Sequence, residues 1–501
     1  MPLQKTRSRV FFLYKYFQDF SGGQNSLFNP ALLKENESPS CQNVRLRAKG
    51  TVSKRGGTKT KNLSPYVDYG VQGFHALYRK DGTKYLLFVI NGTLYSEAST
   101  DDWTGVVTVR TGLSTTNKVR FITYLDKAYV ADGVNTLFRT DGTTYETIAA
   151  APVAGLVMDY KNHIFVVNST TPNRLIFSDL GDPDDWPALN FIEVNSDDGD
   201  RLTALESSYR GRLLIWKERT AWQLFGDSVS NFELDGPRCN YGTVSQESVR
   251  IIGDLVYWLA REGIVAWNLS SSVLISEKID PDIDRINQPY IAKSAGFAFR
   301  NEYMISCPCD GSVTNNRTFV FDTLRAAWIV DVGYYPAVWG SWAPAGQDLL
   351  YSGHITQGRL VEHEQEDRND DGAAIDAWWT TREEDFELDT PKVFRGLRIH
   401  FETQNTPSNI EVWISRDHSA YELLATIDTQ VVTSVWDSAL WDKGVWDEAA
   451  TAKVYGLSDW FRATTVSYRF RNRTLDDNFG LLRWGAFYSG RQPTARYFDD
   501  K

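Results

Sequence analysis

One loop of the sequence carries oxygen-bearing side chains at the spacing of a calcium-binding loop. Asp367, Asn369 and Asp371 alternate along the chain and are followed by a glycine, which is how a loop that wraps a cation begins. The twelfth position of such a loop needs a bidentate glutamate, but Trp378 stands there. The pattern indicates a weak cation site at most, and the alternative is a charged β-turn that binds no metal.

A second stretch repeats the dipeptide Trp-Asp at a spacing of five, with tryptophans at Trp436, Trp441 and Trp446. In WD-repeat propellers this dipeptide recurs once per blade, about 40–45 residues apart, so the stretch is not that signature. A step of five also spreads side chains around a helix and alternates the faces of a strand. We therefore interpret it as a turn-rich ribbon whose indoles form assembly contacts, with carbohydrate stacking as the alternative.

The sequence contains no familiar catalytic motif. GxSxG, GxxxxGK[ST], GxGxxG and HExxH are all missing, the six histidines are scattered, and the four cysteines do not form CxxC pairs. Acidic clusters fall in Gly- and Pro-rich stretches, where carboxylates usually belong to solvated turns. We expect no catalytic residue, no cofactor and no enzymatic activity. A glycosidase with two carboxylates over a central channel is the alternative.

The elements that position these residues are expected to be strands. Val, Ile, Thr, Tyr, Phe and Trp occur in short runs that are broken by 36 glycines and by Asn-Gly or Asp-Gly pairs. A chain of 501 residues is also too long for a single core. The sequence therefore predicts an all-β protein of more than one domain.

A recurring phrase organises the middle of the chain. Each copy has a small turn, an aromatic-rich strand, a second turn and a second strand, and successive copies begin about 36–49 residues apart, as blades of a propeller do. The copies occupy residues 81–98, 125–142, 161–179, 210–227, 253–268, 301–322 and 346–364. We predict a β-propeller of six or seven blades over residues 65–370, with stacked sandwiches as the alternative. The phrases LYRKDGTKY (77–85) and LFRTDGTTY (137–145) support the first two copies.

Different patterns flank this region. Residues 371–501 contain longer alternating runs and predict a C-terminal β-sandwich-like domain. Residues 1–64 have several turn-forming pairs and few alternating runs, so we expect an extended N-terminal arm that becomes ordered against a partner.

Charge is distributed unevenly between these regions. Residues 1–62 hold 12 basic and 3 acidic residues, a net charge of +9, so the rest of the chain carries −20 of the total −11. We expect the arm to contact acidic neighbours or copies of the same chain, with nucleic acid as the alternative. Since DNA affinity comes largely from neutralised phosphates, an acidic body should repel DNA. No export signal or apolar run of membrane-spanning length is evident, so we expect a soluble, unprocessed chain.

Further patterns occur in residues 18–59, 178–187, 197–226, 242–267, 275–284, 371–387 and 435–442, and they include QDFSGGQNSLFNP, SDLGDPDDWP and DGAAIDAWWTTREEDFE. These stretches resemble the tail hub or nozzle proteins of double-stranded DNA phages, a family that stabilises packaged DNA. The resemblance spans most of the chain and rests on degenerate patterns.

The resemblance implies a virion protein that is made in the host cytoplasm and assembles into a homo-oligomeric, six-fold ring of propeller-bearing subunits. Such a ring extends the DNA exit channel below portal and adaptor proteins, retains packaged DNA, and docks tail fibres or spikes. Double-stranded DNA would pass through without sequence-specific binding. A glycan- or receptor-binding propeller of a phage tail is the alternative.

Overall fold

The computed structural model describes residues 11–47, 50–61, 68–98, 105–387, 389–402, 408–429, 452–457 and 460–490. Its contacts divide the chain into two compact units. The propeller unit comprises Thr58–Thr323 and Val332–Gln365, and the sandwich unit comprises Met1–Gly57, Leu324–Asp331 and Glu366–Lys501. No described helix is long and apolar enough to cross a membrane.

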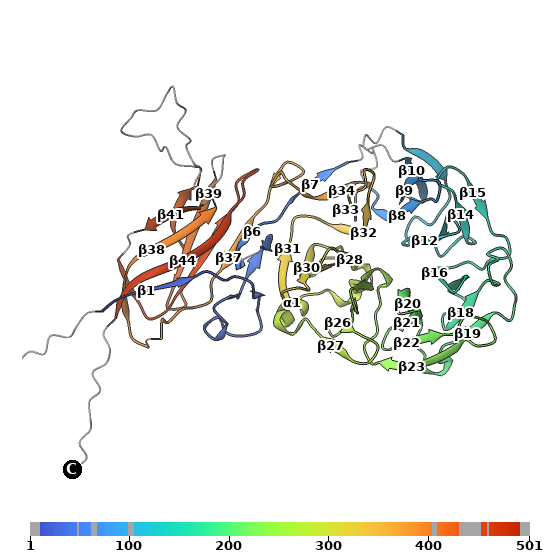
Figure 1. Cartoon of the computed structure of the whole chain (residues 1–501), viewed down its shortest axis with the longest axis horizontal. Coiled ribbons are helices and arrows are strands. Elements are labelled where there is room, and N and C mark those ends of the chain that lie inside the picture. Colours follow the sequence, from blue (N-terminus) through green and yellow to red (C-terminus); the bar gives the residue numbers. More distant parts are fainter. Residues whose placement is uncertain are drawn as a thin grey trace, which may run out of the picture. The chain divides into compact units, whose positions relative to one another are not determined.

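The propeller unit is a succession of small antiparallel sheets that follow one another in chain order (Figure 1). The first five blades each have four strands. The first blade has β8 (Val71–Tyr78), β9 (Lys84–Ile90), β10 (Thr93–Ala98) and β11 (Val107–Arg110), and the second has β12 (Arg120–Tyr124), β13 (Lys127–Ala131), β14 (Phe138–Thr140) and β15 (Tyr145–Thr147). The third has β16 (Leu156–Tyr160), β17 (His163–Val167), β18 (Arg174–Phe177) and β19 (Phe191–Glu193), the fourth has β20 (Leu202–Tyr209), β21 (Arg212–Lys217), β22 (Ala221–Phe225) and β23 (Glu233–Cys239), and the fifth has β24 (Arg250–Ile252), β25 (Leu255–Leu259), β26 (Ile264–Trp267) and β27 (Ser272–Leu274).

The sixth and seventh blades complete the ring. The sixth contributes β28 (Ala295–Phe299), β29 (Glu302–Cys307) and β30 (Arg317–Asp322), and the seventh β32 (Pro336–Trp342), β33 (Leu349–His354) and β34 (Leu360–Gln365). A strand from much earlier in the chain, β7 (Gly57–Thr60), lies beside β34 in the seventh blade. The helical segments between the unit's strands are η3 (Ser196–Asp198), η4 (Gln246–Ser248), η5 (Glu277–Ile279), α1 (Asp280–Ile283) and η6 (Gln288–Lys293).

The innermost strands of neighbouring blades contact one another around the ring. The contacts run from β8 to β12, β16 and β20, continue from β24 to β28 and β32, and return from β32 to β8. Between the fourth and fifth blades the link is η4, where the Gln246 side chain accepts a hydrogen bond from the Leu205 amide at 2.6 Å and donates one to its carbonyl at 2.8 Å. The propeller is therefore closed and has seven blades.

The repeated phrase of the sequence corresponds to one part of every blade. Each copy falls on the hairpin formed by the second and third strands, from β9 and β10 in the first blade to β33 and β34 in the seventh. These hairpins are buried because aromatic and β-branched side chains face both neighbouring blades; β17, for example, is buried along its whole length. The predicted repeat is confirmed.

The literal match between residues 77–85 and 137–145 has a different origin from the repeat. Asp81 lies in the turn between β8 and β9, whereas Asp141 lies in the turn between β14 and β15. In both turns the aspartate accepts a hydrogen bond from the amide two residues later, at 2.9 Å from Thr83 and 2.8 Å from Thr143. The shared Asp-Gly-Thr sequence thus reflects turn chemistry and not equivalent positions in two blades, and our interpretation of this match was wrong.

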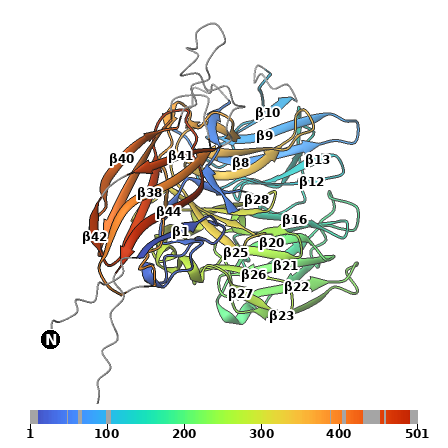
Figure 2. The ribbon, with the colours of Figure 1, turned by 60° about the vertical axis from the view of Figure 1, so that its left-hand side comes forward.

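The sandwich unit contains two antiparallel sheets, and Figure 2 shows β38, β44 and β1 of the first one side by side. The first sheet orders β41 (Ala452–Leu457), β38 (Lys392–Glu402), β44 (Gly480–Gly490), β6 (Val52–Lys54) and β5 (Val44–Leu46), with β1 (Phe11–Phe17) paired to β44 and β42 (Phe461–Ala463) to β38. The second orders β4 (Cys41–Gln42), β37 (Ala377–Thr380), β43 (Val466–Asn472), β39 (Asn409–Arg416) and β40 (Glu422–Asp428).

Aromatic side chains join the two sheets. The rings of Tyr468 on β43 and Trp484 on β44 lie 5.3 Å apart, and those of Phe401 on β38 and Phe470 on β43 lie 6.1 Å apart. All four side chains are buried, while Arg469 and Arg471 alternate with them on the opposite face of β43. The predicted C-terminal β-sandwich is therefore present.

The N-terminal residues from residue 11 onward pair with strands of their own chain, whereas we expected an extended arm that becomes ordered against a partner. They supply β1, β4, β5 and β6 to the sandwich sheets, and they form the short parallel pair β2 (Gly23–Gln24) and β3 (Glu37–Ser38), with η1 (Pro30–Leu32) between these two strands in the chain. The unit also takes in β31 (Ala327–Asp331), which contacts β2, β4 and β5. The predicted domains 1–64, 65–370 and 371–501 therefore need correction, because strand pairing with distant segments decides where these residues belong.

Candidate functional site

A cavity of about 190 Å³ lies along the axis of the propeller, between the innermost strands. Six of the seven blades contribute to its wall, through strands β8, β12, β16, β20, β24 and β32 and through η4. The lining side chains include Phe74, Phe121, Met158 and Trp339 on the apolar side and Arg120, Glu206, Glu247 and Arg250 on the polar side. The wall of the cavity thus combines aromatic side chains with two carboxylates and two guanidinium groups.

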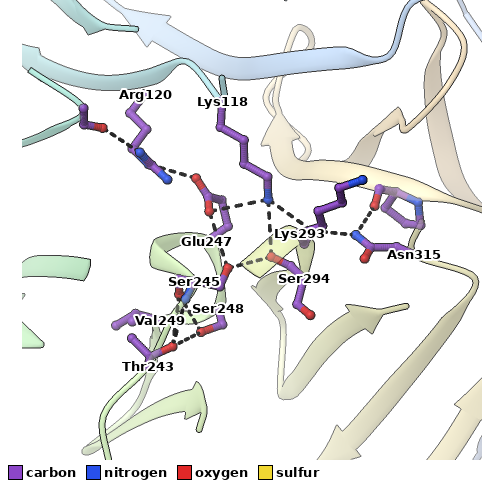
Figure 3. A network of polar contacts seen from close by, with 12 residues as sticks. Lys118, Arg120, Thr243, Ser245, Glu247, Ser248, Val249, Lys293, Ser294 and Asn315 are labelled. Carbon is purple, nitrogen blue, oxygen red and sulfur yellow. Dashed lines mark hydrogen bonds and ion pairs between the residues drawn. The ribbon is translucent and has the colours of Figure 1, made fainter. Parts of the chain in front are cut away.

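Glu247 is at the centre of a network of polar contacts that borders the cavity (Figure 3). It projects from η4, where its carboxylate lies 2.9 Å from Nε of Arg120 and 3.4 Å from Nζ of Lys118. Both cations come from the start of the second blade, whereas Glu247 comes from η4, which precedes the fifth blade. The side chain of Glu247 is 12% exposed, so this triad is mostly removed from solvent.

Backbone carbonyls extend the triad to further blades. Arg120 donates from Nη1 to the carbonyl of Gly155 at 2.6 Å, which reaches the third blade. Lys118 donates to the carbonyls of Lys293 and Ser294 at 3.2 and 3.3 Å, next to the sixth blade. Ser245 donates to the same Ser294 carbonyl at 2.7 Å. We call Lys118, Arg120, Ser245 and Glu247 the channel brace, because together they link the second, third, fifth and sixth blades.

The electrostatics of the brace favour a permanently ionised carboxylate. Burial alone would raise the pKa of Glu247, but the charges of Arg120 and Lys118 lower it to about 2. Burial lowers the pKa of Lys118, and the nearby Glu247 opposes that shift. A carboxylate with a pKa near 2 holds no proton at neutral pH, so it cannot serve as a general acid there and is a weak base. Glu247 therefore stays ion-paired with Arg120 and Lys118 at neutral pH, and these pairs link the blades.

The structure places the predicted cation loop in a two-residue hairpin. Asn369 belongs to β35 (Asn369–Asp370), which pairs with β36 (Ala373–Ala374), and Asp371 sits in the turn between them with a positive φ of 51°. The Asn369 side chain accepts a hydrogen bond from the Gly372 amide at 2.7 Å and donates one to Asp476. Within the described part of the chain, no group of three His, Cys, Asp or Glu residues is placed to hold a metal ion.

One carboxylate of the loop has a structural partner. Asp370, which sequence reasoning passed over, accepts a hydrogen bond from Arg55 at 2.8 Å. The tryptophans of the Trp-Asp ribbon, Trp436, Trp441 and Trp446, lie outside the described residues.

Sequence reasoning did not find the channel brace. Lys118 and Arg120 are separated from Glu247 by more than a hundred residues, and no short motif surrounds either group. The one usable signal is where these residues lie relative to the repeated hairpins. Arg120 is the first residue of the strand before the second hairpin, and Glu247 lies in the segment that precedes the fifth blade. In a closed propeller, residues at these points face the common axis.

Comparisons with known proteins add similarities of fold only. No family model matches the sequence, and no curated protein matches it. Among solved structures, the extracellular domain of a one-component system from B. thetaiotaomicron is 9% identical with a TM-score of 0.44, covering 80% of this chain and 58% of that one. The Neurospora crassa Pan2 WD40 domain is 8% identical with a TM-score of 0.37, covering 62% of this chain and 95% of that one.

The chain spans little more than half the length of the first of these structures. A further similarity is to YCF48 bound to a D1 peptide, at 11% identity and a TM-score of 0.38, covering 62% of this chain and 95% of that one. None of these similarities assigns an activity to the chain.

Proposed function

We propose that this chain is a structural protein of a phage tail, a ring-forming hub or nozzle without catalytic activity. In this role it extends the DNA exit channel below the portal and adaptor proteins, retains packaged DNA and docks fibres or spikes. Its partners would be further copies of itself, in a six-fold ring, and those neighbouring tail proteins. It would be made in the host cytoplasm and reside in the virion.

The observation that carries this proposal is the spread of the family resemblance along the chain. The resembling stretches include residues 18–59 and 371–387, which contribute strands to the sandwich unit, and residues 197–226 and 242–267, which supply three strands each to the fourth and fifth blades. A resemblance that reaches both units favours a shared architecture over a single borrowed domain.

The charge arrangement is compatible with this role. Arg45 pairs with Asp331 at 2.8 Å, Arg55 with Asp370, and Lys61 with Glu362 at 2.6 Å, so several cations of the N-terminal region are neutralised within their own chain. The remaining surface then reflects the overall net charge of −11. A negatively charged wall repels phosphates, which suits the proposed DNA exit channel of the ring, because DNA must pass through it without binding.

The proposal is tested by the composition of phage particles. Particles of the phage that encodes this chain should be purified from infected cells, and the chain quantified by mass spectrometry relative to the portal protein. We expect a fixed stoichiometry of six copies per particle, together with empty or DNA-leaking heads when the gene carries a stop codon. Particles that lack the chain and still retain DNA would contradict the proposal.

A second candidate function, glycan or receptor binding, is favoured by one face of the sandwich unit. Trp378 on β37 and Trp413 on β39 flank Arg469 and Arg471 of β43 on the same sheet face, since directly paired residues share a face. The Arg469 guanidinium lies 4.5 Å from the centre of the Tyr421 ring. Half-buried rings of this kind can stack on sugars. Glycan-array binding by the isolated protein, lost in Trp413→Ala, would support this role.

A further inference from the structure

The axial cavity of the propeller combines apolar walls with one poorly compensated cation. Phe74, Phe121 and Trp339 supply aromatic surface, and Met158 adds a flexible apolar side chain. The volume of about 190 Å³ exceeds the roughly 150 Å³ of an apolar cavity that accepts benzene. The cavity is therefore large enough for a six-membered ring with one small substituent, and it is too small for most drug-sized ligands.

Arg250 is the side chain that gives this cavity a chemical preference. It begins β24, and its Nη1 donates to the carbonyl of Val249 at 2.5 Å. Its guanidinium carbon also lies 5.9 Å from the centre of the Phe297 ring. Among the described residues it forms no ion pair, because Glu206 and Glu247 act on it only through space. Most of its five donors are therefore available to a ligand.

The second arginine of the cavity is committed elsewhere. Arg120 donates hydrogen bonds to the Glu247 carboxylate and to the Gly155 carbonyl. Lys118 and Arg120 share the single negative charge of Glu247, so the brace carries one positive charge in excess. With Glu206 and Arg250 included, the site holds three cationic and two anionic side chains, so it has one positive charge in excess. Burial lowers the pKa of Arg250, which is what an incompletely compensated cation shows.

We propose that the axial cavity binds a small carboxylic acid anion with a ring-sized apolar body. The carboxylate accepts paired hydrogen bonds from Arg250, a geometry that the planar guanidinium favours, and the ring lies against Phe74, Phe121 and Trp339. A cationic ligand does not fit, because the excess charge of the site is already positive. The inference depends on the propeller alone and holds whether or not the chain belongs to a phage tail.

The probe for this site is benzoate, titrated into the purified full chain by isothermal calorimetry. Benzyl alcohol carries the same ring without charge, and acetate carries the charge without the ring. We expect saturable one-to-one binding of benzoate that is at least about tenfold tighter than that of either control, since it combines ring burial with a charged hydrogen bond. Equal binding of benzyl alcohol would overturn the anionic part of the proposal, and absence of saturable benzoate binding would overturn all of it.

Two further measurements locate the ligand. Arg250→Gln should weaken benzoate binding about tenfold or more, whereas Arg238→Gln, which removes an exposed arginine paired with Asp235, should leave it unchanged. If Arg250→Gln does not fold, hydrogen exchange on the unmodified protein replaces it. Benzoate should then protect amides of β12 and β24, which border the cavity, and protection confined to outer strands such as β15 or β27 would place the ligand elsewhere.

Discussion

The two units of this protein are built in opposite ways. The propeller unit is a series of sheets that follow the chain in order, with β7 as the exception that completes the seventh blade. The sandwich unit collects its strands from both ends of the chain, as the pairing of Phe11 with Gly490 shows. Local hairpins therefore define the first unit, whereas long-range pairs of strands and charges define the second. This difference predicts which substitutions should lower the free energy of unfolding of each unit the most.

The largest expected effect is in the sandwich unit. Arg45 and Asp331 come from two of its three segments, and their side chains are 7% and 0% exposed. Replacing Arg45 by Met removes a guanidinium from a buried carboxylate, which typically costs about 3–5 kcal/mol. Urea denaturation followed by tryptophan fluorescence should show a decrease of that size in the free energy of unfolding.

The matched control is Arg473→Met. Arg473 pairs with Glu411 at 2.7 Å in the same unit, but its side chain is 54% exposed. Solvent screens such a pair, so the loss should stay below about 1 kcal/mol. Equal losses in the two variants would mean that the Arg45 pair does not join the segments of the unit as described.

The same contrast explains what the sequence could predict. The seven hairpins were located correctly because each one is encoded within about twenty residues by turns and aromatic strands. The pairing of β1 with β44 could not be predicted, since nothing in the sequence FFLYKYF specifies a partner at the opposite end of the chain. The channel brace was missed for the same reason, because Glu247 meets Arg120 only after the ring closes.

The next effect tests whether the propeller also depends on a long-range contact. Glu247→Gln keeps the shape of the side chain and removes the charge that Lys118 and Arg120 share. We expect a loss of about 1.5–3 kcal/mol, the usual range for hydrogen bonds to charged groups, in urea denaturation. The control is Glu193→Gln, whose carboxylate is 47% exposed beside Arg174 and should matter little. A negligible effect of Glu247→Gln would show that the stability of the propeller does not depend on the channel brace.

The acid sensitivity of the propeller sharpens this test. Glu247 has a pKa of about 2 in the folded chain, against an ordinary value of 4.5. The ionised form is therefore favoured by folding, and its contribution to stability is complete above about pH 4.5 and is lost as the pH falls toward 2. The difference in stability between the unmodified protein and Glu247→Gln should shrink across that window. A difference that stays constant down to pH 2 would contradict the pKa.

The smallest expected effect concerns the two Asp-Gly-Thr turns. Asp141 accepts hydrogen bonds from the amides of Thr143 and Thr144, each at 2.8 Å, whereas Asp81 accepts from the amide of Thr83 alone. Asp141→Ala should cost at most about 1 kcal/mol, and Asp81→Ala should cost less. Thermal unfolding of both variants measures this order. Equal losses would mean that the shared Asp-Gly-Thr sequence, and not the additional hydrogen bond to Asp141, determines the contribution of each turn.

The central claim is that this chain assembles into a ring, and its mass in solution tests that claim most directly. Multi-angle light scattering of the purified protein, alone and mixed with lysate of infected cells, should give an assembly of about six times the 56.9 kDa of one chain. Electron-microscope class averages of that assembly should show six-fold views with an open centre. A species that stays at the mass of one chain under both conditions would contradict the account.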